Sequence, residues 1–229
     1  MSDFAASRDR MVETIAGRGV SDPGVLAAMR DTPREMFVDP ELRPYAYEDR
    51  PLSIGDRQTI SQPYIVALMI DAAKLKPGDR VLEIGTGSGY AAAVMRRLAA
   101  RVYTVERHAS LAEAARRRFA ELGLDNIETR IGDGSLGWPE AAPFDAILVA
   151  ASGPEFPDAL KRQLAPDGRL VMPVGPEVHR QTLSRLTRRG ADEDRIDDLG
   201  PVAFVPLIGE QGWPIGSRSN GGASATRRR

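Results

Sequence analysis

The residues with the clearest potential for chemistry form a glycine-rich turn, in which Glu83 is followed by Gly85, Gly87 and Gly89. Glycines permit tight backbone turns and let a ligand approach the free amides at the N-terminus of a following helix. A dinucleotide-binding fingerprint would need its third glycine at position 90, which is Tyr90, and a P-loop would need a Gly-Lys-Ser/Thr ending, which is missing. The turn is therefore either a purely structural loop or the site of another kind of cofactor.

Two further acids follow predicted strands. Glu106 ends the second strand of this region, 21 residues after Gly85, where a carboxylate can accept hydrogen bonds from both hydroxyls of a ribose. Asp133 ends the third strand, where a carboxylate can accept from an adenine amino group. Because open parallel sheets bind ligands at the carboxyl ends of their strands, Glu83, Glu106 and Asp133 are expected to form one polar rim, although each could instead cap a following helix. Alternating glycines preceded by an acid are the pattern of S-adenosylmethionine-dependent methyltransferases.

Ser61 is another candidate, at the start of a helix predicted over residues 62–74. The favoured interpretation of this serine is the N-cap of that helix. The same position also places a hydroxyl and free backbone amides where an anionic substrate could dock. His108 and His179 are the two histidines of the chain, and neither is favoured as a general base, because His108 lies in a predicted loop and His179 in a polar connection.

The elements that must position these residues alternate between strand and helix from residue 80 onward. Strands are predicted at 81–84, 102–105, 127–131, 144–150 and 169–174, with helices at 90–98, 110–123 and 157–164 and closing strands at 181–187 and 202–207. Ser110 and Glu113 have the spacing of a capping box at the start of the second helix. This rhythm predicts an α/β fold with a doubly wound, mostly parallel sheet. The N-terminal third is predicted to be helical and irregular, with Asp22 as an N-cap before Pro23.

Composition limits what else the chain can be. It has 229 residues, 31 Lys+Arg against 32 Asp+Glu, two histidines and no cysteine. The length fits a single domain over 1–215, made of an N-terminal helical, substrate-side extension (1–78) and a cofactor-binding α/β core (79–215), followed by a disordered tail over 216–229. A cysteine-ligated zinc or iron–sulfur site is excluded by the lack of cysteine, and with two histidines a multi-histidine metal site is not expected. The near-neutral charge argues against a nucleic-acid partner, and the lack of a long apolar run, signal peptide or surplus apolar stripe predicts a cytoplasmic monomer without membrane contact.

A resemblance to a known family extends well beyond the glycine turn. The chain resembles the protein-L-isoaspartate O-methyltransferases in segments 33–38, 58–67, 81–90, 105–107, 132–134, 137–139, 142–147, 168–175 and 204–207. Together these segments cover about residues 20–210 in order. The segment Thr-Ile-Ser-Gln-Pro, residues 59–63, is highly specific to this family, whereas the glycine turn is shared by most methyltransferases.

The resemblance implies a Rossmann-like methyltransferase fold with an N-terminal helical extension. It also implies an activity: methyl transfer from S-adenosylmethionine to the free α-carboxylate of L-isoaspartyl residues in damaged proteins, with S-adenosylhomocysteine as product. The ester would then close to a succinimide, whose hydrolysis regenerates some normal aspartate. Matching positions imply Ser61 as the active-site serine and, as acceptor-binding residues, Thr59, Ile60, Gln62 and Val205. The implied cofactor-binding residues are Glu83, Gly85, Thr86, Gly87, Ser88, Gly89, Glu106, Arg107, Asp133 and Gly134.

One departure from the family pattern bears on the substrate. Asp56 and Arg57 stand where the family usually has an aromatic residue or His followed by Gly. These two residues either form an exposed ion pair, or Arg57 binds an anionic group of the acceptor. The second interpretation motivates an alternative function, a carboxylate methyltransferase of the same fold acting on another acceptor, such as an aspartate in a dedicated peptide. A non-catalytic cofactor-binding module is a further alternative, and a nicotinamide-dependent oxidoreductase is disfavoured by Tyr90.

Overall fold

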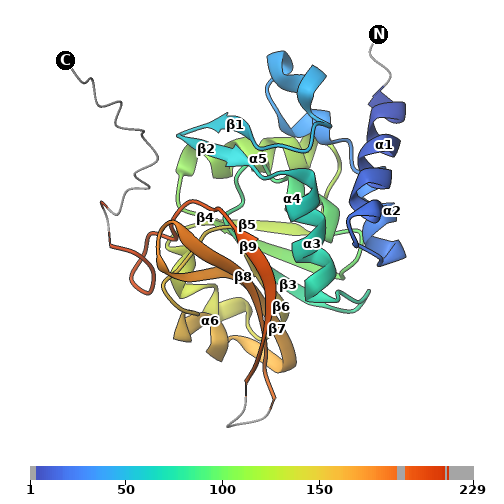
Figure 1. The fold of residues 1–229 in the computed structure, drawn as a ribbon. Coiled ribbons are helices and arrows are strands. Elements are labelled where there is room, and N and C mark those ends of the chain that lie inside the picture. Colours follow the sequence, from blue (N-terminus) through green and yellow to red (C-terminus); the bar gives the residue numbers. More distant parts are fainter. Residues whose placement is uncertain (1–3, 190–193, 215, 217–229) are drawn as a thin grey trace, which may run out of the picture.

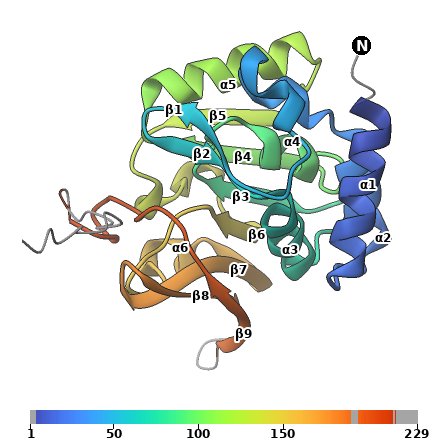
Figure 2. The same cartoon turned by 45° about the horizontal axis from the view of Figure 1, so that its top comes forward.

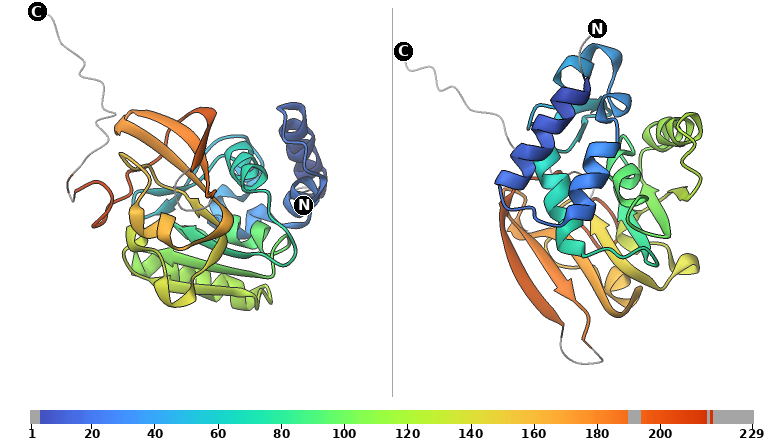
Figure 3. Two further views of the ribbon diagram at one scale, coloured as in Figure 1. Left: turned by 90° about the horizontal axis from the view of Figure 1, so that it is seen from below. Right: turned by 90° about the vertical axis from the view of Figure 1, so that its right-hand side faces the viewer.

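The computed structural model describes residues 4–189, 194–214 and 216. The N-terminal third consists of α1 (Phe4–Gly17), α2 (Pro23–Asp31) and two 3-10 helices, η1 (Arg34–Phe37) and η2 (Pro40–Tyr45). Asp22 caps α2 as predicted, because its side chain accepts hydrogen bonds from the backbone N–H groups of Gly24 and Val25. Figure 3 shows α1 and α2 side by side at one flank of the molecule, and both contact α3 (Pro63–Ala73). The tail predicted to be disordered lies outside the described residues apart from Gly216.

The central sheet has, within the described ranges, seven strands in the order β5-β4-β3-β6-β7-β8-β9 (Figure 1). Their bounds are β3 (Arg80–Ile84), β4 (Arg101–Glu106), β5 (Ile127–Ile131), β6 (Phe144–Val149), β7 (Leu164–Glu177), β8 (Arg180–Thr187) and β9 (Arg195–Val202). Strands β3 to β7 pair in parallel, while β8 and β9 pair antiparallel, so the predicted mostly parallel sheet is confirmed. From β3 to β5 the chain adds strands on one side of β3, and it then crosses over and adds β6 on the other side. Open parallel sheets bind ligands at such a switch point.

The closing strand predicted over 202–207 is wrong. The last strand, β9, ends at Val202, and the Gln181 side chain then takes over the hydrogen bonds of Phe204. The Gln181 amide oxygen accepts from the Phe204 N–H at 2.7 Å, and its nitrogen donates to the Phe204 carbonyl at 2.9 Å. The chain therefore leaves the sheet and runs past Ser152, which lies just after β6. The Ser152 N–H donates to the carbonyl of Val205, and the Ser152 carbonyl accepts from the N–H of Leu207.

Helices cover both faces of the sheet. Neighbouring residues of one strand point to opposite faces, so that Val81 and Val102 belong to one apolar core and Leu82 and Tyr103 to the other. The first face carries α1 to α3, α4 (Tyr90–Met95) and α5 (Ala109–Glu121), and the second carries α6 (Asp158–Arg162). Two 3-10 helices, η3 (Gly134–Leu136) and η4 (Pro139–Ala141), follow β5.

A separate hairpin of β1 (Leu52–Gly55) and β2 (Gln58–Ile60) lies beside α5 (Figure 2). Its two turn residues, Asp56 and Arg57, adopt left-handed backbone angles, with φ of 47° and 59°. The Asp56 carboxylate accepts a hydrogen bond from the Ser110 hydroxyl in the first turn of α5. The predicted capping box is therefore wrong: Ser110 anchors the hairpin, and α5 begins without a side-chain cap.

The helices are short or polar. Across residues 4–189, 194–214 and 216, none of the helices is both long and apolar enough to cross a bilayer.

Candidate active site

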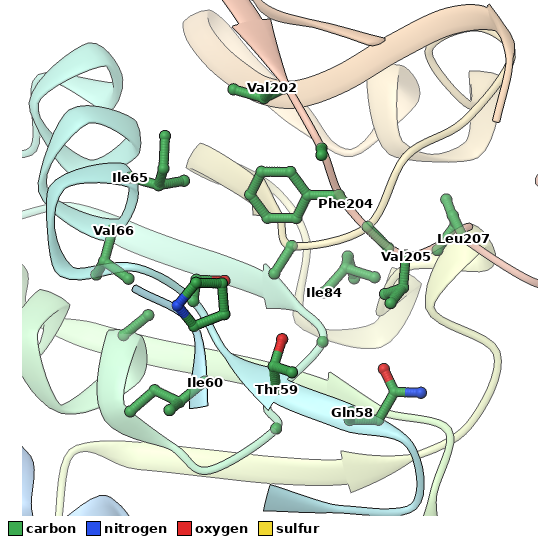
Figure 4. Close-up of a pocket in the computed structure, with 18 of the residues that line it drawn as sticks. Gln58, Thr59, Ile60, Ile65, Val66, Ile84, Val202, Phe204, Val205 and Leu207 are labelled. Carbon is green, nitrogen blue, oxygen red and sulfur yellow. The ribbon is translucent and has the colours of Figure 1, made fainter. Parts of the chain in front are cut away.

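A cavity of about 1020 Å³ opens at the carboxyl ends of β3 and β4. It is lined by the glycine turn after β3, the end of β4, β2 with the start of α3, and residues 199–208. In Figure 4, Thr59 and Ile60 lie along one side of the cavity, while Phe204 and Val205 face them from the other. The fold thus brings the predicted cofactor segments and the predicted acceptor segments into one space.

Most residues predicted for the site line this cavity. From the acceptor set, the lining residues are Thr59, Ile60, Ser61, Gln62 and Val205. From the cofactor set, they are Glu83, Gly85, Thr86, Gly87, Ser88, Glu106, Arg107 and Gly134. Gly89 is the N-cap of α4 instead, with a φ of 87°, and a Cβ there would lie 2.6 Å from the Phe119 ring. Its glycine is therefore required by packing and by backbone conformation.

The Glu106 carboxylate is fixed at the end of β4. One of its oxygens accepts a hydrogen bond from the N–H of Gly87 and the other from the N–H of His108, both at 2.9 Å. Glu106 is 5% exposed. Because each carboxylate oxygen has two lone pairs, both oxygens can still accept from a diol such as a ribose.

The Glu83 carboxyl group is buried beneath the glycine turn. The Thr104 hydroxyl donates to it at 2.5 Å and lies 2.6 Å from the Thr86 hydroxyl, so that three polar groups form a chain. Burial raises the pKa of Glu83 to about 8, and the nearby charge of Glu106 adds to that effect, while the hydrogen bond from Thr104 opposes it. The site therefore favours the protonated form of Glu83.

Asp133 is held differently from the other two acids. One of its oxygens accepts from the N–H and hydroxyl of Ser135, and the other accepts from the N–H of Glu210 at 2.8 Å. A Cβ at Gly209 would lie 2.0 Å from the Asp133 carboxylate, so the backbone of this C-terminal segment packs closely against it. Asp133 thus caps η3, in line with the capping alternative, and its contact with adenine stays a prediction.

Ser61 does not cap α3, so this part of the prediction is wrong. Gln62 is the N-cap residue, and the Asp49 carboxylate accepts from the N–H of Tyr64 at 3.1 Å in place of a capping serine. Ser61 is half-buried at the cavity wall, and its hydroxyl forms no hydrogen bond with the part of the chain that the structure describes. The hydroxyl is therefore available to a ligand.

Arg57 is placed away from the cavity. It is exposed at the tip of the β1–β2 hairpin, and its neighbour Asp56 is bonded to Ser110. Within residues 4–189, 194–214 and 216, Asp56 and Arg57 form no ion pair, so the structure supports neither the exposed pair nor an Arg57 directed at the acceptor.

Comparison with known proteins identifies the family. The model of the protein-L-isoaspartate(D-aspartate) O-methyltransferases matches residues 6–212. The chain belongs to this family. It is 62% identical over 207 residues to a protein-L-isoaspartate O-methyltransferase of Methylorubrum extorquens, which covers 90% of each chain. It is 57% identical to protein-L-isoaspartate O-methyltransferase 1 of Rhodopseudomonas palustris, over 93% of this chain and 87% of the relative.

Solved structures of the same family have the same fold. One protein-L-isoaspartate O-methyltransferase superimposes with a TM-score of 0.79 at 32% identity, covering 90% of this chain and 67% of the other. Another, a Plasmodium falciparum protein assigned to these enzymes, was solved in complex with S-adenosyl-L-homocysteine. It gives a TM-score of 0.75 at 27% identity and covers 88% and 98% of the two chains. The predicted Rossmann-like methyltransferase fold with an N-terminal helical extension is confirmed.

The cavity of this methyltransferase suits S-adenosylmethionine, the cofactor on which the family depends. The Glu106 oxygens have lone pairs to spare for the ribose, and Gly87 carries no side chain that would block approach to the turn. Gly134 packs so closely on β3 that a Cβ would lie 2.3 Å from Ile84, so that only glycine fits at this position of the cavity wall. The Glu106 carboxylate in this space matches a cofactor whose sulfonium is positively charged.

Sequence reasoning missed several residues around the acceptor end of the methyltransferase. Arg18 and Phe204 line the cavity, and Arg34 and Asp49 hold the segment that contains Ser61. Arg34 lies in one of the segments that resemble the family, but no local spacing connects it with Ser61. The contact depends on how the N-terminal helices fold back onto α3, which residue patterns do not report.

Proposed function

We propose that Ser61 positions the acceptor carboxylate in the reaction that this chain catalyses, methyl transfer from S-adenosylmethionine to the free α-carboxylate of L-isoaspartyl residues in proteins. The observation that carries the proposal is the Ser61 hydroxyl, which has no partner among the described residues and lines the same cavity as Glu106 and the glycine turn. A free donor at the wall of a site for a cationic methyl donor can orient an anionic acceptor.

The acceptor chemistry needs little from the protein. A carboxylic acid with a pKa near ~4 is ionised at neutral pH, so it is already a nucleophile and needs no general base. S-Adenosylmethionine supplies an electrophilic methyl group when bound. The Ser61 hydroxyl donates a hydrogen bond to the carboxylate, while Thr59, Ile60, Gln62 and Val205 hold the acceptor backbone. Alignment and exclusion of water by such residues contribute several kcal/mol in general.

On the cofactor side, Glu106 accepts from the ribose hydroxyls, and Gly85 and Gly87 allow the methionine part to approach the backbone. The other residues proposed for this side are Glu83, Thr86, Ser88, Arg107, Asp133 and Gly134, while Gly89 shapes the turn through its packing on Phe119. The buried, amide-anchored carboxylate of Glu106 supports this assignment most directly. After transfer, the neighbouring backbone amide nitrogen attacks the methyl ester and loses its proton, and methanol leaves. Hydrolysis of the resulting succinimide restores some normal aspartate.

The first experiment compares two synthetic peptides, one with isoaspartate and one with normal aspartate, using labelled S-adenosylmethionine. We expect base-labile label on the isoaspartyl peptide alone. Ser61→Ala should lower turnover about 10- to 100-fold, because it removes a single positioning donor, and should leave the affinity for S-adenosylhomocysteine within about twofold. A parallel loss of cofactor affinity and turnover would contradict the role given to Ser61.

We also propose which part of the chain binds the acceptor and which the cofactor, and we propose its oligomeric state and its location. Residues 1–78 supply most of the acceptor side, joined by Val205, and the other site residues of 79–215 hold the cofactor. The position of β2 and the start of α3 in the cavity wall supports this division. The chain acts as a cytoplasmic monomer without nucleic acid or membrane, in keeping with its formal net charge of −1. Light scattering with and without S-adenosylhomocysteine tests the monomer, and a mass of two chains would contradict it.

A further inference from the structure

The N-terminal extension buries one guanidinium completely. Arg34, the first residue of η1, is 0% exposed and forms no ion pair within the described part of the chain. Its guanidinium lies over the ring of Tyr90, 4.7 Å from the centroid, and its Nη1 has no hydrogen-bond partner among the described residues. Burial lowers the pKa of Arg34 to about 10. The attraction of Asp49 does not offset the burial of this cation, and a buried cation without an ion pair is costly, so packing alone does not explain why an arginine stands there.

The two hydrogen bonds that Arg34 does form point to a more specific role. Its Nε donates to the carbonyl of Ala46 at 2.8 Å, and its Nη2 donates to the carbonyl of Ser61 at 2.8 Å. The guanidinium is a rigid planar fork, so it sets the distance and direction between these two carbonyls. The backbone of Ser61 is thereby tied to the segment that follows η2.

A second charged residue holds the chain just after Ser61. The Asp49 carboxylate accepts from the Gln62 side-chain amide at 2.7 Å and from the N–H of Tyr64 at 3.1 Å. Asp49 also pairs with Arg18, whose guanidinium lies 3.5 Å from the centre of the Tyr64 ring. Ser61 is therefore fixed on its own carbonyl and on the residues that follow it.

We propose that Arg34 and Asp49 are positioning residues for methyl transfer, which clamp the Ser61 backbone so that its hydroxyl stays directed at the acceptor carboxylate. The inference rests on the proposed role of Ser61. Because that hydroxyl has no partner in the described part of the chain, no side-chain contact fixes it. The positions its rotamers can reach are set by the backbone, which the clamp holds. Through the clamp, the N-terminal extension holds the Ser61 segment in place in addition to covering the sheet.

A double-mutant cycle tests the clamp. Arg34→Lys keeps the charge but can no longer bridge two carbonyls, and we expect it to lower kcat for an isoaspartyl peptide about tenfold. In a Ser61→Ala background there is no hydroxyl to direct, so the same change should lower kcat less than about twofold. Affinity for S-adenosylhomocysteine, measured by calorimetry, should stay within about twofold in all four proteins, which also shows that they are folded.

A second double-mutant cycle combines Asp49→Asn with Ser61→Ala. It tests the clamp even if the Arg34→Lys variant does not fold. We expect a loss in kcat of about threefold or more that disappears in the Ser61→Ala background. Arg8→Met is the matched control, because Arg8 is also a partly buried arginine of the extension but bonds Tyr47 and Glu35 instead of the Ser61 segment. It should change kcat less than about twofold.

The outcomes separate the clamp from the role of Ser61. If Ser61→Ala has no effect on kcat, the role of Ser61 is wrong and the clamp falls with it. If Ser61→Ala lowers kcat but Arg34→Lys and Asp49→Asn act equally in both backgrounds, or weaken S-adenosylhomocysteine binding in parallel, the clamp alone is overturned.

Discussion

The two ends of the cavity are built in different ways. At the cofactor end, the glycine turn and Glu106 follow two adjacent strands, and the 2.9 Å bond between Gly87 and Glu106 joins residues only 19 apart in the chain. At the acceptor end, Ser61 is held by Arg34, 27 residues away, and faces a segment around Val205 from the far end of the described chain. The first end is made by strand register, and the second by tertiary packing.

This difference predicts different responses to mutation. At the cofactor end, the proposed contacts come from groups fixed within the sheet, so their loss should reduce cofactor affinity directly. Residues at the acceptor end fix a backbone segment, so their loss should reduce turnover while cofactor affinity is retained. The following variants test that contrast from the largest expected effect to the smallest.

Glu106→Ala should have the largest effect. It removes the proposed ribose acceptor and leaves the N–H groups of Gly87 and His108 without their partner. Since hydrogen bonds to charged groups contribute about 1.5–3 kcal/mol each, we expect affinity for S-adenosylhomocysteine to fall about 100-fold. Calorimetry measures this loss. If the affinity of this variant for S-adenosylhomocysteine stays within a few fold of that of the unmodified chain, cofactor binding does not depend on the Glu106 carboxylate, and the difference between the two ends of the cavity is contradicted.

Glu83→Gln tests the cofactor end through pH. Burial in the folded state raises the pKa of Glu83 from its ordinary value of 4.5 to about 8, so between these pH values the folded chain keeps a proton that the unfolded chain releases. The free energy of unfolding contributed by Glu83 is therefore full below pH 4.5 and declines as the pH rises toward 8. The glutamine variant cannot lose a proton, and we expect it to remove this decline, which a shift of that size makes about 5 kcal/mol.

Denaturant unfolding at several pH values measures this effect. The unmodified chain should lose stability relative to Glu83→Gln between pH 5 and about 8. Thr104→Val is a useful companion, because it removes the hydroxyl that donates to Glu83 but no titratable group. Parallel pH profiles for the unmodified chain and Glu83→Gln would show that Glu83 titrates normally in the fold.

The contrast also explains what could be predicted from sequence. The strand ends and Glu106 follow from local patterns, since parallel strands that end in glycine or an acid must meet at one edge of the sheet. The N-cap role predicted for Ser61 was wrong because Asp49, which is remote in sequence, supplies the acceptor for the Tyr64 N–H. The strand predicted over 202–207 was wrong for a similar reason, because one side chain, Gln181, replaces the ladder hydrogen bonds of Phe204.

Ser110→Ala should have a smaller effect on the cofactor end. The Ser110 hydroxyl anchors Asp56 at the hairpin tip, and Ile54 of the same hairpin packs on the glycine turn, since a Cβ at Gly87 would lie 3.3 Å from Ile54. Without the anchor, the hairpin should cover the bound cofactor less tightly. We expect S-adenosylhomocysteine to dissociate about two- to threefold faster in a stopped-flow experiment, in line with the loss of one exposed hydrogen bond. An unchanged rate would mean that the hairpin does not retain the cofactor.

Arg57→Gly should have the smallest effect on catalysis. It tests whether the acceptor end of the cavity extends to the tip of the β1–β2 hairpin. Arg57 is exposed, lies outside the cavity and has a φ of 59°, which costs a side chain with a Cβ about 1 kcal/mol and costs glycine little. We therefore expect unchanged kcat/KM ratios across acidic, neutral and basic acceptor peptides, together with stability that is equal or slightly higher. A selective loss with acidic peptides would show that Arg57 reads the acceptor after all. In that case the acceptor end would extend to the hairpin tip, and the substrate would be narrower than isoaspartyl peptides in general.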